Sequence, residues 1–146
     1  MDSIQISFER LSVEVLLDYL LLTSKDFPDL NNNYSIENRA KKLSDFANFI
    51  TCRTITGKLV GVIAFYMNDQ KFCYITHVSI MDGYKHRGLC RNMLESIEKM
   101  VRKSAYLSIR MEVLKDNIVA IKSYQHCGFE IVADSSDNSY YMEKFI

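Results

Sequence analysis

The chain has 146 residues and a mass of 17.0 kDa, and 18 basic side chains balance 18 acidic ones. This length fits one domain, residues 1–146, with a full core, and the 48% hydrophobic and 25% charged content is ordinary for a globular protein. A neutral chain has no overall field that would attract nucleic acid or an acidic membrane, so recognition of an anion has to be local. The longest apolar run is broken by Glu14 and Asp18, which argues against a membrane span.

Cysteine spacing and the first residues bear on the setting of the protein. The four cysteines are widely spaced, form no C-x-x-C pair and have no histidine placed to complete a zinc site. We therefore expect reduced thiols and no metal. The stretch "MDSIQISFER" lacks the basic residues and the apolar core of a secretory signal, so we expect a cytoplasmic protein.

Hydrophobic periodicity predicts the elements in chain order. Alternating apolar residues predict a strand at 4–10, and helical spacing after a possible N-cap at Ser12 predicts the first helix. The later elements are a loop at 24–34, a helix at 35–46, strands at 49–55, 58–67 and 72–80, a helix from 89, a strand at 105–114, a helix at 117–127 and strands at 129–133 and 140–145. The three central strands are joined by tight turns, so the first half of the sheet should be antiparallel. This order predicts an α/β (α+β) architecture in two or three layers.

The stretch "YKHRGLCRNML", residues 84–94, concentrates basic side chains around Gly88 at the start of a predicted helix. A helix N-terminus leaves N–H groups outside the helical hydrogen bonds and carries partial positive charge, and a glycine lets an anion approach the backbone. A pyrophosphate is the anion that this arrangement suits, although a solvated basic turn explains the same residues equally well. The stretch is neither a P-loop nor a G-x-G-x-x-G dinucleotide turn.

The same stretch resembles the acyl-CoA-binding signature of the GNAT superfamily of acetyltransferases, Q/R-x-x-G-x-G/A. Lys85 stands at the position of the Gln or Arg, Gly88 matches the first glycine, and Cys90 replaces the second small residue. A second resemblance lies in "MEVLKDNIVAIKSYQHCGFEIV", which has the family's M/L-E-V strand end, N-x-x-A, a Tyr seven residues after the Asn, and G-F. The resemblance implies a GNAT fold, a mixed and mostly antiparallel central sheet with helices on both faces, and acetyl-CoA as co-substrate.

The resemblance also implies which residues bind the cofactor. Pantetheine would run along Val78 and Ile80, and the pyrophosphate would lie against residues 86–91. The full set implied to bind the cofactor is Val78, Ile80, Lys85, His86, Arg87, Gly88, Leu89, Cys90, Arg91, Asn117 and Tyr124. At the position of a small residue, Cys90 is expected to be a spacer rather than a nucleophile.

Acetyl transfer to an amine needs an acid for the leaving thiolate and a base for the amine. In GNAT relatives a Tyr at the position of Tyr124 is the general acid, and a phenol with a pKa near ~10 carries its proton at neutral pH. Glu112 resembles a base found twelve residues before that Tyr, and burial in an apolar strand would raise its pKa; a Glu at a wetter end of the sheet is the alternative. Alternation along 72–80 turns His77 away from the face of Tyr74 and Thr76, so His77 is expected to be a core or surface residue. Deprotonation through ordered water remains an alternative to Glu112.

The expected activity is N-acetylation of a primary amine on a small molecule, an amino sugar or a peptide. In related enzymes Tyr74, Thr76 and the region between the first two helices line the acceptor site, which here includes Phe27 and Tyr34. We expect no nucleic acid or membrane partner, and a monomer or homodimer. Two alternatives stay open: a CoA-binding regulatory or scaffold domain without activity, and a nucleotide- or phosphosugar-binding protein that uses the same helix start.

Overall fold

The computed structural model describes residues 3–27, 33–68 and 71–146. The chain divides into two compact units, Met1–Phe65 with His77–Met93, and Tyr66–Thr76 with Leu94–Ile146. The expectation that residues 1–146 act as one domain stays a prediction.

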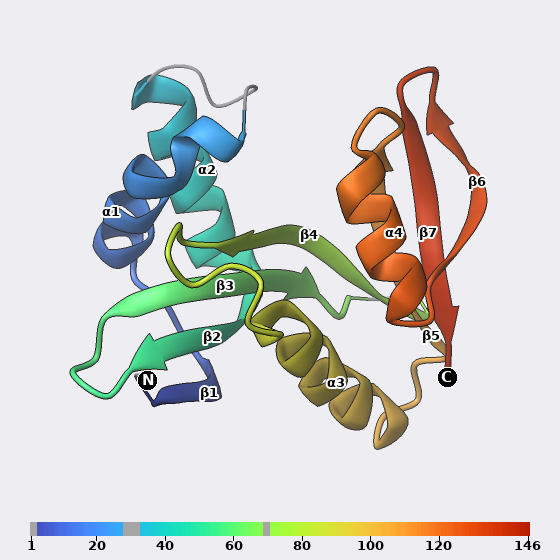
Figure 1. Ribbon diagram of the computed structural model, residues 1–146, viewed down its shortest axis with the longest axis horizontal. Helices are drawn as coiled ribbons and strands as arrows, with labels where there is room; N and C mark the ends of the chain where they lie inside the picture. Colours follow the sequence, from blue (N-terminus) through green and yellow to red (C-terminus); the bar gives the residue numbers. More distant parts are fainter. Residues whose placement is uncertain (1–2, 28–32, 69–70) are drawn as a thin grey trace. The chain divides into compact units, whose positions relative to one another are not determined.

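The elements follow the predicted order, and four α-helices and a seven-stranded sheet lie within the described residues (Figure 1). They are β1 Ile4–Glu9, α1 Val13–Thr23, the 3-10 helix η1 Ser24–Asp26, α2 Asn33–Phe46, β2 Asn48–Thr54, β3 Leu59–Tyr66, β4 Phe72–Ile80, α3 Leu89–Arg102, β5 Ser108–Leu114, α4 Ile118–His126, β6 Glu130–Ser136 and β7 Ser139–Phe145. The strand order is β1-β2-β3-β4-β5-β7-β6. Strands β4 and β5 are parallel, whereas β1/β2, β2/β3, β5/β7 and β6/β7 are antiparallel. The predicted mixed and mostly antiparallel sheet is thereby confirmed.

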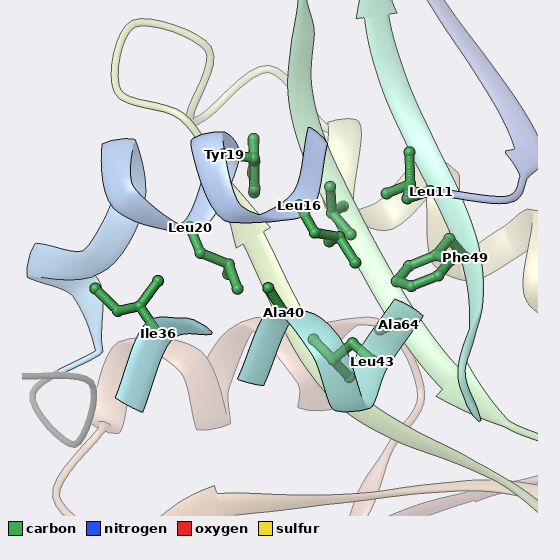
Figure 2. Packing of buried hydrophobic residues seen from close by; sticks show 10 residues of the cluster. Leu11, Leu16, Tyr19, Leu20, Ile36, Ala40, Leu43, Phe49 and Ala64 are labelled. Atoms are coloured by element: carbon green, nitrogen blue, oxygen red, sulfur yellow. The ribbon is translucent and has the colours of Figure 1, made fainter. Parts of the chain in front are cut away.

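In the first unit, α1 and α2 pack their apolar stripes against β2 and β3 (Figure 2). Leu16 and Leu20 of α1 are at most 1% exposed, and Leu43 of α2 is 2% exposed. The Ser12 side chain accepts a hydrogen bond from the Val15 N–H at 3.2 Å, which confirms the predicted N-cap. The buried face of α1 therefore follows Leu16 and Leu20, and that of α2 follows Ile36, Ala40 and Leu43.

Strand β3 is buried on both of its faces. Val62 and Ala64 belong to the cluster under α1 and α2, and Ile63 and Phe65, which alternate with them, are also at most 1% exposed. Gly61 lies in the same strand, and a Cβ built there would lie 2.9 Å from the Ile80 side chain. Close contact between β3 and β4 therefore depends on the missing side chain at residue 61.

In the second unit, β4 and β5 pair through four residues each, from Phe72 with Ser108 to Ile75 with Met111. Helix α4 ends at His126, and Gly128 follows at the C′ position with a φ of +96°, a conformation that suits glycine. The Lys144 ammonium of β7 donates to Glu98 of α3 at 2.8 Å and to the Cys127 carbonyl oxygen at 2.9 Å. One lysine thus fixes the last turn of α4 and the adjoining part of α3.

Three predicted boundaries differ from the structure by two or more residues. Helix α2 begins at Asn33, two residues inside the predicted loop, and β5 begins at Ser108 rather than at 105. Strand β6 continues to Ser136, which leaves two residues between it and β7. Asn, Ser and Asp favour turns in isolation, but pairing with β7 keeps 134–136 extended. Over the ranges that the structure describes, no helix combines the length and apolar character that a bilayer crossing requires.

Candidate active site

The turn at residues 81–88 leads directly into α3. Gly88 has a φ of +77°, and its carbonyl oxygen accepts a hydrogen bond from the Asn92 N–H at 3.0 Å, so this glycine caps the helix. A Cβ built on Gly88 meets no atom within 4 Å, which leaves open space beside it. His86 also has a positive φ, 64°, which is uncommon for a residue with a side chain. The turn therefore places bent backbone at the positive N-terminal end of a helix, a combination that favours an anion.

Lys85, a predicted anion ligand, is already paired with two acids. Its ammonium lies 3.2 Å from a carboxylate oxygen of Asp26 and 3.2 Å from one of Asp82, and Lys25 forms a further ion pair with Asp82. Burial acts to lower the pKa of Lys85, but the hydrogen bonds to the two acids outweigh it and raise the pKa. The two carboxylates thus compensate the positive charge of Lys85, which the sequence analysis assigns to cofactor binding.

The remaining basic side chains of the turn are exposed. These are His86, Arg87 and Arg91. The Arg87 guanidinium lies 5.0 Å from the centre of the Tyr84 ring, and the Lys58 ammonium lies 5.8 Å from it. Cation–π contacts therefore hold the Tyr84 ring between two cations beside the start of α3.

The first two residues of α3 have buried or half-buried side chains. Leu89 is 7% exposed, so its side chain belongs to the core, and Cys90 is half-buried.

The four cysteines are free thiols, as expected. Burial raises the pKa of Cys52 to about 11 and that of Cys73 to about 12, which makes both thiols poor nucleophiles.

Strand β4 carries a buried polar chain that the sequence did not reveal. His77 Nε2 lies 3.0 Å from Ser79 Oγ, and Ser79 Oγ lies 2.8 Å from the Tyr19 hydroxyl of α1. Burial lowers the pKa of His77 to about 3 and raises the pKa of Tyr19. Among the described residues, His77 Nδ1 has no hydrogen-bond partner. His77 is thus a neutral core residue, as expected, and Val78 and Ile80 beside Ser79 are half-buried.

The predicted acceptor residues fall into both units. Phe27 packs on His77 with ring centroids 4.7 Å apart, directly after Asp26 of η1. The side chain of Tyr34 lies outside the described residues. Tyr74 and Thr76 are half-buried in β4. Burial raises the pKa of Tyr74, and the negative charge of Glu112 adds to the effect.

In the second unit, Tyr124 lies on α4 and is half-buried, with its ring 6.2 Å from the Phe129 ring in an edge-to-face contact. Asn117 comes immediately before the helix, and its side-chain oxygen accepts a hydrogen bond from the Ala120 N–H at 3.2 Å. Asn117 therefore caps α4 rather than lying on its face.

Of the two alternatives for Glu112, burial in the sheet is wrong and the wetter position is confirmed, because its side chain is exposed. Alternation along β5 turns Met111 and Val113 into the core, at 2% and 7% exposure, and places Glu112 on the opposite face. Its neighbour across the antiparallel ladder is Tyr141. Within the part of the chain that the structure describes, no lysine or arginine pairs with Glu112.

The same sheet face holds an ion pair that sequence reasoning missed. The Arg110 guanidinium donates to Glu143 at 2.9 Å and lies between the rings of Phe72 and Tyr141, 4.7 Å and 5.1 Å from their centres. Glu143 is 5% exposed and also accepts a hydrogen bond from the Ser108 hydroxyl. Charged residues inside two apolar strands, "SIRMEVL" and "YYMEKF", were the available signal.

Among the residues with defined placement, no group of three or more His, Cys, Asp or Glu side chains could hold a metal ion.

Comparison with protein families finds one match, in which the acetyltransferase (GNAT) family model matches residues 15–129. Comparison with curated proteins finds no match.

Several solved structures share the fold. PaiA N-acetyltransferase from Thermoplasma acidophilum, in complex with coenzyme A, is 17% identical, with 97% of this chain and 99% of that chain covered and a TM-score of 0.71. IAA acetyltransferase from Bacillus cereus is 13% identical, with 97% and 100% covered and a TM-score of 0.74. A Bacillus subtilis acetyltransferase in complex with CoA is 17% identical, with 99% of both chains covered and a TM-score of 0.72. At these identities the similarity establishes the fold.

Proposed function

The chain belongs to the acetyltransferase (GNAT) family and is an acyltransferase, and from this premise we propose that it moves the acetyl group of acetyl-CoA to a primary amine. The acceptor is a small molecule, an amino sugar or a peptide, and the amine attacks the thioester directly in a ternary complex. The turn at 81–88 carries the proposal, because its glycine caps α3 beside open space and exposed cations. Two solved structures with this fold contain coenzyme A, which supports the choice of cofactor.

We assign the diphosphate of the cofactor to the backbone of residues 86–91. The positive end of α3 and the positive φ values of His86 and Gly88 support this assignment. Arg87 and Arg91 are exposed and add positive charge near the start of α3. Val78 and Ile80 are assigned to the pantetheine arm, which has amides that suit hydrogen bonding along a strand.

The transfer requires a balanced exchange of two protons. The amine nitrogen forms a bond to the thioester carbonyl carbon, and the carbon–sulfur bond breaks to release coenzyme A as a thiolate. Tyr124 is proposed to give its phenolic proton to this sulfur, and the second proton of the acylated nitrogen then restores the phenol. The half-buried position of its ring and the resemblance of "NIVAIKSY" to the family motif support that role.

The incoming amine must lose a proton to a base, and we propose Glu112 or an ordered water for this step. Glu112 is exposed and has no cation to compete for it among the described residues, so an ammonium can reach it. Tyr74 and Tyr141 lie beside Glu112, and aromatic rings favour a cation. Thr76, Phe27 and Tyr34 stay proposed acceptor residues on the family resemblance alone. A cytoplasmic monomer or homodimer is the proposed setting.

Calorimetry and a turnover assay test the proposal together. We expect coenzyme A to bind with micromolar or better affinity, and we expect one or more amines in a panel to release thiol from acetyl-CoA. Binding without turnover by any amine, with Tyr124→Phe changing no activity, would indicate a binding domain instead. Stronger thermal stabilisation by ATP than by coenzyme A would move the assignment to a nucleotide-binding protein.

A further inference from the structure

Two segments of the first unit are joined by crossed ion pairs. Lys25 and Asp26 lie in η1, and Asp82 and Lys85 lie in the turn before α3. Lys25 pairs with Asp82, and Lys85 pairs with both Asp26 and Asp82 at 3.2 Å. We call these four residues the charge clasp. They connect a part of the proposed acceptor site to the proposed diphosphate turn.

We propose that the diphosphate of the cofactor competes with Asp26 and Asp82 for Lys85, so that cofactor binding opens the Lys85 side of the charge clasp and loosens η1. The inference rests on the proposed function, because it needs a diphosphate at the turn. It assigns to the two aspartates a role in setting cofactor affinity and in coupling η1 to the turn before α3.

The charges of the clasp favour such an exchange. Two lysines and two aspartates sum to zero, so Lys85 offers little net attraction to an anion while the clasp is closed. A diphosphate carries more negative charge than a carboxylate, and it would occupy the positive end of α3 close to Lys85. The side chains of Lys85 and Asp26 are 37% and 30% exposed, so water already screens their pairing and the exchange costs little.

Opening the clasp would act on Phe27 through η1. The Phe27 N–H donates to the Ser24 carbonyl oxygen at 3.0 Å, so η1 and Phe27 form one hydrogen-bonded turn. With Lys85 withdrawn, η1 keeps the contact of Lys25 with Asp82 and the packing of Phe27 on His77. The segment would therefore loosen without leaving its place.

Affinity measurements on two aspartate variants test the exchange. Asp26→Asn and Asp82→Asn should each bind coenzyme A roughly twofold to fivefold more tightly than the wild type, because Lys85 loses one of its two carboxylate partners. Asp45→Asn is the matched control, because Asp45 is exposed on α2 and pairs with no cation among the described residues. It makes the same charge change and should leave the affinity unaltered.

A double-mutant cycle separates competition for Lys85 from general charge repulsion. Lys85→Gln alone should weaken coenzyme A binding, and Asp26→Asn should no longer tighten binding in that background. Tightening that persists without Lys85 would overturn the proposal, as would unchanged affinity in both aspartate variants. Thermal melts identify any variant that fails to fold, and the second aspartate then decides.

Amide hydrogen exchange provides a readout that needs no acceptor. Coenzyme A should raise exchange at residues 24–27 in the wild type, and Asp26→Asn should show the raised exchange without ligand. No change at these amides while coenzyme A binds would overturn the inference alone. Absence of coenzyme A binding by the wild type would overturn the proposed function and the charge clasp with it.

Discussion

Lys85 in the first unit and Glu112 in the second invite a direct comparison, because both are charged residues to which the sequence assigns chemistry. Lys85 is predicted to be an accessible cation, and the structure pairs it with two acids. For Glu112 the sequence leaves two alternatives, a buried acid or a Glu at the wetter end of the sheet, and the structure leaves it exposed without a paired cation in the described ranges. The chemistry available to a charged side chain thus depends on partners from distant segments, which a local motif does not contain.

The largest expected effect concerns the turn that holds Lys85. Gly88→Glu should lower coenzyme A affinity at least roughly a thousandfold, because it puts a carboxylate into the open space assigned to the diphosphate and strains a backbone with positive φ. Calorimetry measures the loss. Gly57→Glu is the control, since Gly57 also has a positive φ and open space. Wild-type affinity in the Gly88 variant would refute the placement of the diphosphate.

The paired acid near Glu112 should matter for folding. Glu143→Gln should lower the free energy of unfolding by roughly 3 kcal/mol, because it leaves the half-buried Arg110 without its charged partner. Urea unfolding measures the change. A loss below 1 kcal/mol would mean that the pair contributes as little as an exposed one.

The proposed acid on α4 is tested by a change of one atom. Tyr124→Phe should lower kcat roughly a hundredfold and leave the dissociation constant of coenzyme A within about twofold, because only the proton donor is lost. Tyr106→Phe removes a hydroxyl that donates to the Asn68 carbonyl oxygen, and it should leave kcat unchanged. Equal activity of the Tyr124 variant and the wild type would remove the phenol from the mechanism.

A buried neutral group in the first unit extends the comparison to pH. The folded pKa of His77 is about 3 and the ordinary value is 6.5, so the unfolded chain binds more protons between these values. The contribution of neutral His77 to the free energy of unfolding is therefore fully present above pH 6.5, and it falls as the pH drops toward 3. Between pH 7 and 4 the wild type should lose about 2–3 kcal/mol more stability than His77→Gln.

Unfolding at several pH values gives this difference, and His126→Gln, a change at an exposed histidine, should follow the wild type. The groups around His77 are Phe27, Ser79 and Arg39, and the charge of Arg39 adds to the effect of burial on the pKa. Parallel curves for the His77 variant and the wild type would show that protonation of this ring does not limit stability in acid.

The smallest expected effect belongs to Glu112. Glu112→Gln should lower kcat only about tenfold, because water can replace an exposed carboxylate as base. Steady-state kinetics measure the change. An unchanged kcat would assign deprotonation to water alone.

Most of the fold could be predicted because the sequence pattern has a direct cause in the structure. Alternation over 72–80 matches β4 residue for residue, and the leucine spacing after Ser12 matches the buried side of α1. Gly128 marks the end of α4 because its positive φ suits a glycine. The ends of α2 and β6 could not be placed as well, because pairing and packing override the turn preference of Asn, Ser and Asp.

The candidate site was predictable only where a local motif defines it. The turn around Gly88 and the start of α3 follow from one continuous stretch. The contacts of Lys85 with Asp26, of His77 with Phe27 and of Arg110 with Glu143 join residues at least 33 positions apart. Such contacts depend on how strands and helices pack, so neither composition nor spacing gives them.

Gly61 shows how strongly a silent position can constrain the family's chemistry. A single methyl group at this residue would lie 2.9 Å from Ile80 Cδ1 and 3.2 Å from the Cβ of Cys52, whereas Gly88 has room to spare. A side chain at residue 61 therefore requires the end of the Ile80 side chain and the Cys52 side chain to shift. Loss of activity in a mutational scan consequently identifies two kinds of glycine here, one that admits a ligand and one that lets two strands meet.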